Sequence, residues 1–153
     1  MALFNLTGLR RELARDQRLI GLDLGAVTIG VALSDVRLTL ATPYGSLRRG
    51  KLRANAAAVA EIARREGAGG LVVGLPVSMD GTLGPAAQAA RDWTLALSEA
   101  TRLPATLWDE RLSSAAVNRF LIGEVDLSRR KRAQVVDRMA AAWILQSALD
   151  ASR

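Results

Sequence analysis

The sequence predicts an α/β domain built on one mixed, five-stranded sheet with helices on both faces. Residues 18–49 hold three short apolar segments with very little sequence between them, which is typical of strands joined as antiparallel hairpins. From Lys51 onward, amphipathic segments alternate with short apolar runs, which is typical of strands joined by helices. A chain of 153 residues is long enough to close one sizeable core, so we assign these elements to a single domain.

The first three strands are predicted to form an antiparallel meander. RLIGLDLG (18–25) and TIGVALSD (28–35) are apolar segments separated by a glycine-bearing turn, so they form a tight hairpin. LTLATPYGSLRR (38–49) supplies the third strand, in which Pro43 and Gly45 indicate a bend or a place at the sheet edge.

The rest of the chain alternates helices and strands. Apolar residues at helical spacing predict a helix that starts near Leu52 and stops at Gly67, and Pro85 opens the next helix. Asp80-Gly81 marks a turn in the loop between them. The remaining predicted elements are strands at 69–76 and 105–110, helices at 113–124 and at about 132–149, and a basic loop at 125–132.

Residues 1–17 mix apolar and charged positions without an anchoring pattern. We expect them to be a flexible, loosely attached extension that could form a short helix, and we expect the packed domain to span residues 18–150. The same residues carry charge where a signal peptide needs its apolar region, and no apolar stretch is long enough to span a membrane. The expected compartment is therefore the cytoplasm.

Charge and composition restrict the function. Lys and Arg total 21 against 15 Asp and Glu, a net charge of +6, which favours a polyanionic partner such as nucleic acid or the ribosome, or an anionic membrane surface. The chain has no His and no Cys, which excludes a Ser-His triad, a histidine base, a thiolate nucleophile and a Cys/His zinc site. A hydrolase of this composition would depend on carboxylates and a hard metal ion.

Asp23 is the first acid in an unexpected place. It lies within the apolar segment 18–25, beside Leu22 and Leu24, where an unpaired carboxylate is costly. Gly25 lets the backbone turn sharply or lets a ligand approach closely. The alternative is that Asp23 caps a turn at the strand end.

Asp137 is the second such acid. In the last predicted helix it shares a face with the small apolar residues Ala140, Ala141 and Ile144, so the helix would lay this carboxylate against the sheet. Arg138 belongs to the solvated side of the same helix. A salt bridge from Asp137 to a distant arginine is the alternative to a metal site.

Asp109 and Glu110 end the strand at 105–110, and strand alternation sends them to opposite faces. Only one of them can face the same site as Asp23, and the pattern alone does not say which. An ordinary exposed acid at a strand end is the alternative for either.

Carboxylates gathered at the strand ends repel one another unless divalent cations bind between them. Mg²⁺ or Mn²⁺, as two ions, would suit such a cluster and the hydrolysis of a phosphodiester. The basic stretches RRGKLR (48–53) and SRRKR (128–132) would bind the phosphate backbone, although each could be a solvated loop. The candidate nucleic-acid contacts are Arg48, Arg49, Lys51, Arg111, Arg129, Arg130, Lys131 and Arg132.

Four segments carry a resemblance to a known family: GLDLGAVTIGVALSD, VVGLPVSMDGTLGP, WDERLSS and VVDRMAAAWIL. In this order and spacing they resemble the YqgF family, also called RuvX or Holliday-junction-resolvase-like, over residues 18–149. The resemblance implies an RNase H-like fold and a catalytic, metal-binding triad of Asp23, Glu110 and Asp137, which selects Glu110 over Asp109. The loop from Gly74 to Gly81 is a family mark that we expect to shape the site or a dimer.

The resemblance implies two activities, maturation of the 5′ end of precursor 16S rRNA and resolution of four-way DNA junctions. One carboxylate–metal site can cut either nucleic acid, so the residues do not choose between them. A junction resolvase is expected to be a homodimer, because a symmetric junction needs two matched cuts.

Two other functions compete with a nuclease. D-x-G followed by a second strand also resembles the phosphate loop of actin-like ATPases, but those need two such domains and this chain holds one. A non-catalytic nucleic-acid-binding module, with structural acids under a basic surface, is the other alternative.

Overall fold

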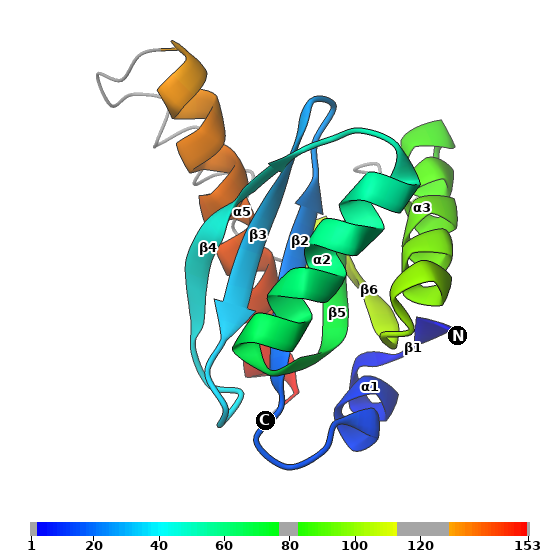
Figure 1. Cartoon of the computed structure of the whole chain (residues 1–153), viewed down its shortest axis with the longest axis vertical. Helices are drawn as coiled ribbons and strands as arrows, with labels where there is room; N and C mark the ends of the chain where they lie inside the picture. Colours follow the sequence, from blue (N-terminus) through cyan, green and yellow to red (C-terminus); the bar gives the residue numbers. More distant parts are fainter. Residues whose placement is uncertain (1–2, 77–82, 113–128, 153) are drawn as a thin grey trace.

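The structure of the chain is a computed structural model that describes residues 3–76, 83–112 and 129–152. Figure 1 shows one sheet with helices packed against both of its faces. The elements are β1 (Leu3–Phe4), α1 (Leu6–Glu12), β2 (Arg18–Leu24), β3 (Thr28–Ser34), β4 (Ala41–Arg48), α2 (Leu52–Glu66), β5 (Ala68–Leu75), α3 (Pro85–Thr101), β6 (Ala105–Asp109), the 3₁₀ helix η1 (Glu110–Leu112) and α5 (Arg129–Ala151).

The sheet has the order β1-β6-β5-β2-β3-β4. Strands β2, β3 and β4 are antiparallel neighbours, as the meander requires, whereas β5 runs parallel to both β2 and β6. This mixed topology confirms the predicted fold class. The sheet has six strands rather than five, because β1 pairs with β6 in parallel.

The N-terminal segment differs from its expected loose attachment. Leu3 and Phe4 pair with Ala105 and Thr106 to add the sixth strand, and α1 follows directly. Leu9 of α1 is completely buried among side chains of α5 and the sheet. Residues 3–12 are therefore part of the packed domain, and a short helix does form within them.

The sheet has an apolar core on each of its two sides. On one side, α2 and α3 cover a core that includes Ile20, Leu22, Val73 and Leu97. On the other side, α5 and α1 cover a second core. We call these sides the α2–α3 face and the α5 face; in Figure 1, α2 and α3 lie in front of the sheet and α5 behind it.

Local signals fix several element boundaries where the sequence predicted them. Helix α2 ends at Gly67, whose φ of 69° is the left-handed conformation that favours glycine. Pro85 occupies the first turn of α3, where its missing N–H costs no hydrogen bond. Within the ranges that the structure describes, every helix is too short or too polar to span a membrane.

The predicted basic loop before the last helix is partly wrong. Helix α5 begins at Arg129, so residues 129–132 lie in its first turn rather than in a loop. The predicted turn at Asp80-Gly81 and the predicted helix at 113–124 lie outside the described residues.

Candidate active site

Asp23 lies on the α5 face, one residue before the end of β2. Ile20 and Leu22 belong to the core under α2 and α3, while Leu19 belongs to the core under α5. Because side chains alternate along a strand, Gly21 and Asp23 share the α5 face with Leu19. The Asp23 side chain has little contact with solvent, since the residue is only 6% exposed.

Glu110 follows the last residue of β6. In β6, Leu107 packs into the core under α2 and α3, whereas Trp108 packs on α5 and donates a hydrogen bond from Nε1 to Ser147 Oγ at 3.2 Å. Glu110 follows Trp108 by two positions, opens η1, and has a buried Oε1 atom. Trp108 and η1 both contact α5, so the chain leaves β6 toward the helix that covers the face of Asp23.

The strand register brings Asp23 and Glu110 to one edge of the sheet. Leu22 pairs with Val73, and Val73 pairs with Leu107, so these residues are level across three parallel strands. Asp23 is one step beyond this level and Glu110 three steps beyond it. Both carboxylates therefore stand where β2 and β6 end, on either side of β5, at the edge where ligands bind to α/β sheets.

Helix α5 approaches this part of the sheet closely because two strand residues are glycines. A Cβ atom at Gly21 would lie 2.7 Å from Leu145 Cβ, and one at Gly74 would lie 2.6 Å from Ile144 Cδ1. Real Cβ atoms do not come so near to other heavy atoms, so the helix could not lie this close over a side chain at Gly21, where the neighbouring atoms are Leu145 Cβ and the Ala141 carbonyl oxygen. At Gly74 the contact is with the end of the Ile144 side chain, which could turn away.

Asp137 belongs to the N-terminal half of α5. Farther along the helix, Gln146 binds the β3–β4 connection, with Oε1 2.8 Å from the Ala41 backbone nitrogen. This contact fixes the direction of α5: its C-terminal half lies over the opposite end of the sheet, and its start lies at the end near the β2–β3 turn (Figure 1).

Ala140, Ala141 and Ile144, which share the predicted face of Asp137, are completely buried. The Asp137 side chain itself lies outside the described side chains. Its role as the third carboxylate therefore stays a prediction.

Asp109 forms an ion pair with Arg111. The Arg111 guanidinium donates from Nη2 to Asp109 Oδ2 at 2.7 Å and from Nε to Oδ1 at 3.2 Å. These hydrogen bonds hold the pKa of Asp109 below its ordinary value of 3.8, against the opposing effect of burial. In this structure Arg111 is engaged with Asp109, so its predicted phosphate contact would require the guanidinium to use its remaining donors or to move.

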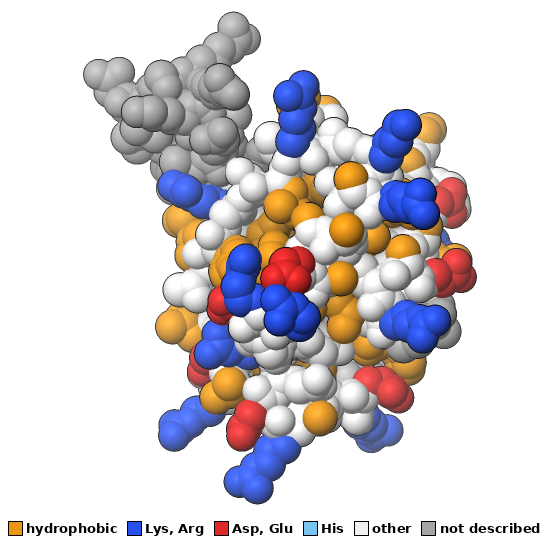
Figure 2. All heavy atoms as spheres, in the orientation of Figure 1, with side chains coloured by type: hydrophobic (Ala, Val, Ile, Leu, Met, Phe, Trp, Pro, Cys, Tyr) orange, Lys and Arg blue, Asp and Glu red, His pale blue; other side chains and the backbone are white. Residues whose placement is uncertain are grey.

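A group of basic residues lies at the same end of the molecule. Arg48, Arg49 and Lys51 are all exposed, in the segment that joins the end of β4 to the start of α2. Arg48 pairs with Thr28 at the start of β3, next to the turn that follows Asp23. We call Arg48, Arg49 and Lys51 the basic rim. Figure 2 shows Lys and Arg side chains projecting at this upper end.

The second predicted basic stretch begins the helix that carries Asp137. The side chains of Arg129, Arg130, Lys131 and Arg132 lie outside the described side chains, and their predicted contacts with nucleic acid remain untested.

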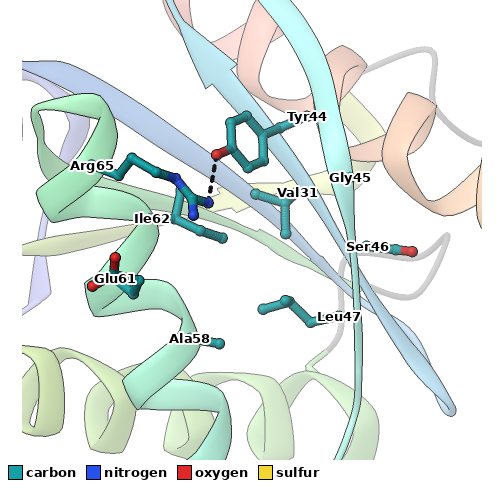
Figure 3. A pocket seen from close by; sticks show the side chains of 9 residues that line it. All are labelled: Val31, Tyr44, Gly45, Ser46, Leu47, Ala58, Glu61, Ile62 and Arg65. Atoms are coloured by element: carbon teal, nitrogen blue, oxygen red, sulfur yellow. Dashed lines mark hydrogen bonds between the residues drawn. The ribbon is translucent and has the colours of Figure 1, made fainter.

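A separate groove of about 300 Å³ lies on the α2–α3 face, between β4 and α2. Figure 3 shows Tyr44 and Arg65 pointing toward each other across it, with Arg65 Nη2 donating to the Tyr44 hydroxyl at 2.8 Å. The one carboxylate in its lining is Glu61, which binds Arg64 at 2.6 Å. This groove opens on the opposite side of the sheet from Asp23 and includes neither Asp23 nor Glu110.

The donor atoms available at the sheet edge are oxygens. Carboxylate oxygens are ligands for hard divalent cations such as Mg²⁺ and Mn²⁺, and the absence of His and Cys from the chain removes softer donors. Asp23 and Glu110 therefore fit such an ion chemically. Among the described side chains, no group of three potential metal ligands lies together. The side chain of Asp137 is not one of those described.

Sequence reasoning gave no role to Gly21 or Asn55. A glycine inside an apolar strand is the usual signal for close backbone approach, so Gly21 could have been found. Asn55 is a polar residue on the apolar side of α2, three positions after Leu52 and four before Val59. That position is also a recognisable signal, because a buried amide needs partners.

The order of this mixed sheet, with helices on both faces and α5 packed closely on one of them, defines an RNase H-like fold. RuvC of Thermus thermophilus shares the fold. Its structure in complex with a Holliday junction substrate gives a TM-score of 0.54 at 17% identity, over 88% of this chain and 94% of that one. A second structure of Thermus thermophilus RuvC gives a TM-score of 0.53 at 14% identity, over 88% and 95% of the two chains.

The chain belongs to the RuvX family, described as Holliday junction resolvase, whose family model matches residues 17–151. A protein of Gluconacetobacter diazotrophicus is 63% identical over 99% of both chains, and one of Acidiphilium cryptum is 61% identical over 98% of this chain and 94% of its own. Both carry the name "Putative pre-16S rRNA nuclease". The family assignment made from the four sequence segments is confirmed.

Proposed function

We propose that this protein is a divalent-metal-dependent nuclease that cuts precursor 16S rRNA, with Asp23, Glu110 and Asp137 as its catalytic carboxylates. The observation that supports the proposal is the strand register, which brings the buried Asp23 and the partly buried Glu110 to one edge of the sheet. We choose precursor 16S rRNA as the substrate because it stands in the names of relatives that are 61% and 63% identical over nearly the whole chain.

The three carboxylates would hold Mg²⁺ or Mn²⁺, as two ions. When bound, the metal supplies activation of the attacking water and stabilisation of the leaving oxygen. Asp23 and Glu110 approach from β2 and from the end of β6, and Asp137 would complete the set from α5. Asp23 and the Oε1 atom of Glu110 are shielded from bulk water, and a carboxylate attracts a nearby cation more strongly there than in water.

The basic rim would bind phosphates of the substrate beside these carboxylates. Arg48, Arg49 and Lys51 are exposed at the end of the sheet where β2 finishes. Their charge is part of the net +6 of the chain and gives affinity for any nucleic-acid backbone without reading its sequence. Arg111 and residues 129–132 are further candidates for the same role.

A four-way DNA junction is the second substrate to test, because the family is described as Holliday junction resolvase. Cutting a symmetric junction would require a homodimer, whereas trimming a ribosomal precursor would not. A precursor rRNA substrate places the protein's work in the cytoplasm.

The test is cleavage by the purified protein in Mg²⁺ or Mn²⁺, with a precursor 16S 5′ fragment and a synthetic four-way junction as substrates. Asp23→Asn, Glu110→Gln and Asp137→Asn should each cut at least a hundredfold more slowly than the parent, since each removes a carboxylate that the metal needs. Asp92→Asn is the matched control, because Asp92 is an exposed carboxylate on α3.

Cleavage of the RNA fragment that depends on all three carboxylates would establish the proposal. Paired symmetric nicks in the junction, without cleavage of the RNA, would replace the substrate by junction DNA. If both nucleic acids were bound and neither was cut, the chain would be a non-catalytic binding module instead.

A further inference from the structure

The turn that follows Asp23 is tied to a distant segment of the chain. Gly25 donates its backbone N–H to Thr28 at 2.9 Å and closes the turn between β2 and β3. Arg49 then holds this turn twice: its backbone N–H donates to the Val27 carbonyl at 2.8 Å, and its Nη1 donates to the Gly25 carbonyl at 3.0 Å. The second bond reaches a residue only two positions after Asp23.

Asn55 holds the segment that carries Arg49. This residue of α2 is 4% exposed, and its amide bonds in both directions. Its Oδ1 accepts from the Gly50 backbone N–H at 3.0 Å, and its Nδ2 donates to the Arg48 carbonyl at 3.0 Å. The backbone on both sides of Arg49 is therefore fixed to the first turns of α2.

These contacts form one continuous connection from a helix to the candidate site. It runs from α2 through Asn55 to residues 48–50, and from Arg49 to the carbonyl of Gly25. The turn needs such support because it projects at the end of the sheet, where Val27 is 67% exposed, and because it begins with a glycine.

We propose that Arg49 and Asn55 are positioning residues that hold the end of β2 so that Asp23 keeps the geometry a metal ion requires. The proposal rests on the proposed function, in which Asp23 binds metal. Residues that orient a metal ligand from outside the coordination shell typically contribute 10–100-fold to metal affinity or activity. Neither Arg49 nor Asn55 touches the metal in this role.

Besides its place in the basic rim, Arg49 then has a task that its neighbour Arg48 does not share. Leu47 packs into the core under α2 and α3, so strand alternation assigns Arg48 to the α5 face, the face of Asp23. Arg48 adds positive charge on the side where substrate would bind, whereas Arg49 uses a guanidinium donor to hold the turn. The two roles predict different phenotypes.

The experiment measures Mn²⁺ affinity by titration calorimetry, and separately the salt dependence of RNA binding in EDTA. Asn55→Ala and Arg49→Met should each weaken Mn²⁺ binding by roughly 10–100-fold. Asn55→Ala should leave the salt slope of RNA binding unchanged, because it removes no charge. Arg48→Ala should leave the Mn²⁺ affinity unchanged and should lower the salt slope of RNA binding by about 1, because it removes one phosphate contact.

Arg37→Ala is the matched control. Arg37 is an exposed arginine in the other hairpin connection, at the opposite end of the sheet, and its loss should change neither quantity. Arg49→Met covers the case in which Asn55→Ala fails to fold, because Arg49 is exposed and methionine keeps an unbranched stem.

The outcomes separate this inference from the proposed function. If the parent binds Mn²⁺, Asp23→Asn abolishes binding, and Arg49→Met binds as tightly as the parent, the positioning role is wrong and the nuclease proposal stands. If Asp23→Asn binds Mn²⁺ as well as the parent does, the metal site itself is wrong, and the positioning role falls with it.

Discussion

At the scale of single residues, Asp109 and Glu110 are adjacent in the sequence and have opposite environments. Asp109 binds the Arg111 guanidinium, which lowers its pKa and completes an ion pair at 2.7 Å. Glu110 opens η1, which contacts α5, and its Oε1 is buried. The first carboxylate is paired with Arg111, and the second lies in the element that contacts α5.

Exchange of each acid for its amide tests this difference. Glu110→Gln should lower the nuclease rate at least a hundredfold, because it removes a charged oxygen at the candidate metal site. Asp109→Asn should keep the rate within about threefold of the parent, since Asp109 is paired with Arg111 and is not among the carboxylates proposed to hold the metal. Single-turnover cleavage of the precursor rRNA fragment would measure both. A larger loss in Asp109→Asn than in Glu110→Gln would contradict the choice of Glu110 over Asp109.

At the scale of elements, the packing of α5 on β2 and β5 connects the sheet to the rest of the site. Gly21 and Gly74 leave room for Leu145 and Ile144, and this close approach brings the helix backbone against the strands. The same helix carries Asp137 nearer its start and bonds to the β3–β4 connection through Gln146. The position of Asp137 along the sheet therefore depends on contacts that α5 makes within the next few turns.

Gly21→Ala should lower the free energy of unfolding by about 1–3 kcal/mol, because the new methyl group overpacks a closed contact. Its Cβ would lie 2.7 Å from Leu145 Cβ and 3.1 Å from the Ala141 carbonyl oxygen, and neither atom can turn away. Denaturant unfolding measures the change.

Gly45→Ala is the control for this substitution. It adds the same methyl group in an edge strand where no heavy atom lies within 4 Å of the new Cβ. Its effect should stay within about 1 kcal/mol. Equal losses in the two variants would show that α5 does not pack closely at Gly21.

At the scale of the whole molecule, the N-terminal segment completes the domain that the later strands begin. Strand β1 covers the edge of β6, and α1 places Leu9 in the core under α5. Arg10 also donates to the Ser152 hydroxyl at 2.6 Å, which joins the segment to the end of α5. The two ends of the described chain therefore pack on each other, and β6, which leads to Glu110, lies inside the sheet.

Leu9→Ala tests whether this segment contributes to global stability. Removing a completely buried leucine should cost about 2–5 kcal/mol, through lost apolar burial and the cavity that remains. Leu40→Ala, at a leucine that is 59% exposed, should change the free energy of unfolding by no more than about 0.5 kcal/mol. Thermal and denaturant unfolding of both variants would measure the difference. If Leu9→Ala behaved like Leu40→Ala, residues 3–12 would not be part of the folded unit.

Much of the fold could be predicted from the sequence because it depends on the local spacing of apolar residues and on the glycines and prolines at the ends of elements. The hairpin around Gly25, the end of α2 at Gly67 and the start of α3 at Pro85 all follow from short patterns. The packing of residues 3–12 against the rest of the domain could not be predicted in this way. A two-residue strand has no periodicity, and its pairing with β6 depends on residues a hundred positions away.

The sequence by itself determined the family, the mixed sheet and the kind of chemistry available, since a chain without His and Cys offers oxygen ligands at its carboxylates. It also pointed to Asp23, because a carboxylate in an apolar strand is costly unless it pairs with a cation or binds a metal ion. Only the tertiary structure decided that Asp109 pairs with Arg111 while η1, which Glu110 opens, contacts α5, because both depend on how the chain turns after β6. The connection from Asn55 through Arg49 to Gly25 likewise joins residues that no local pattern relates, and folding alone brings them together.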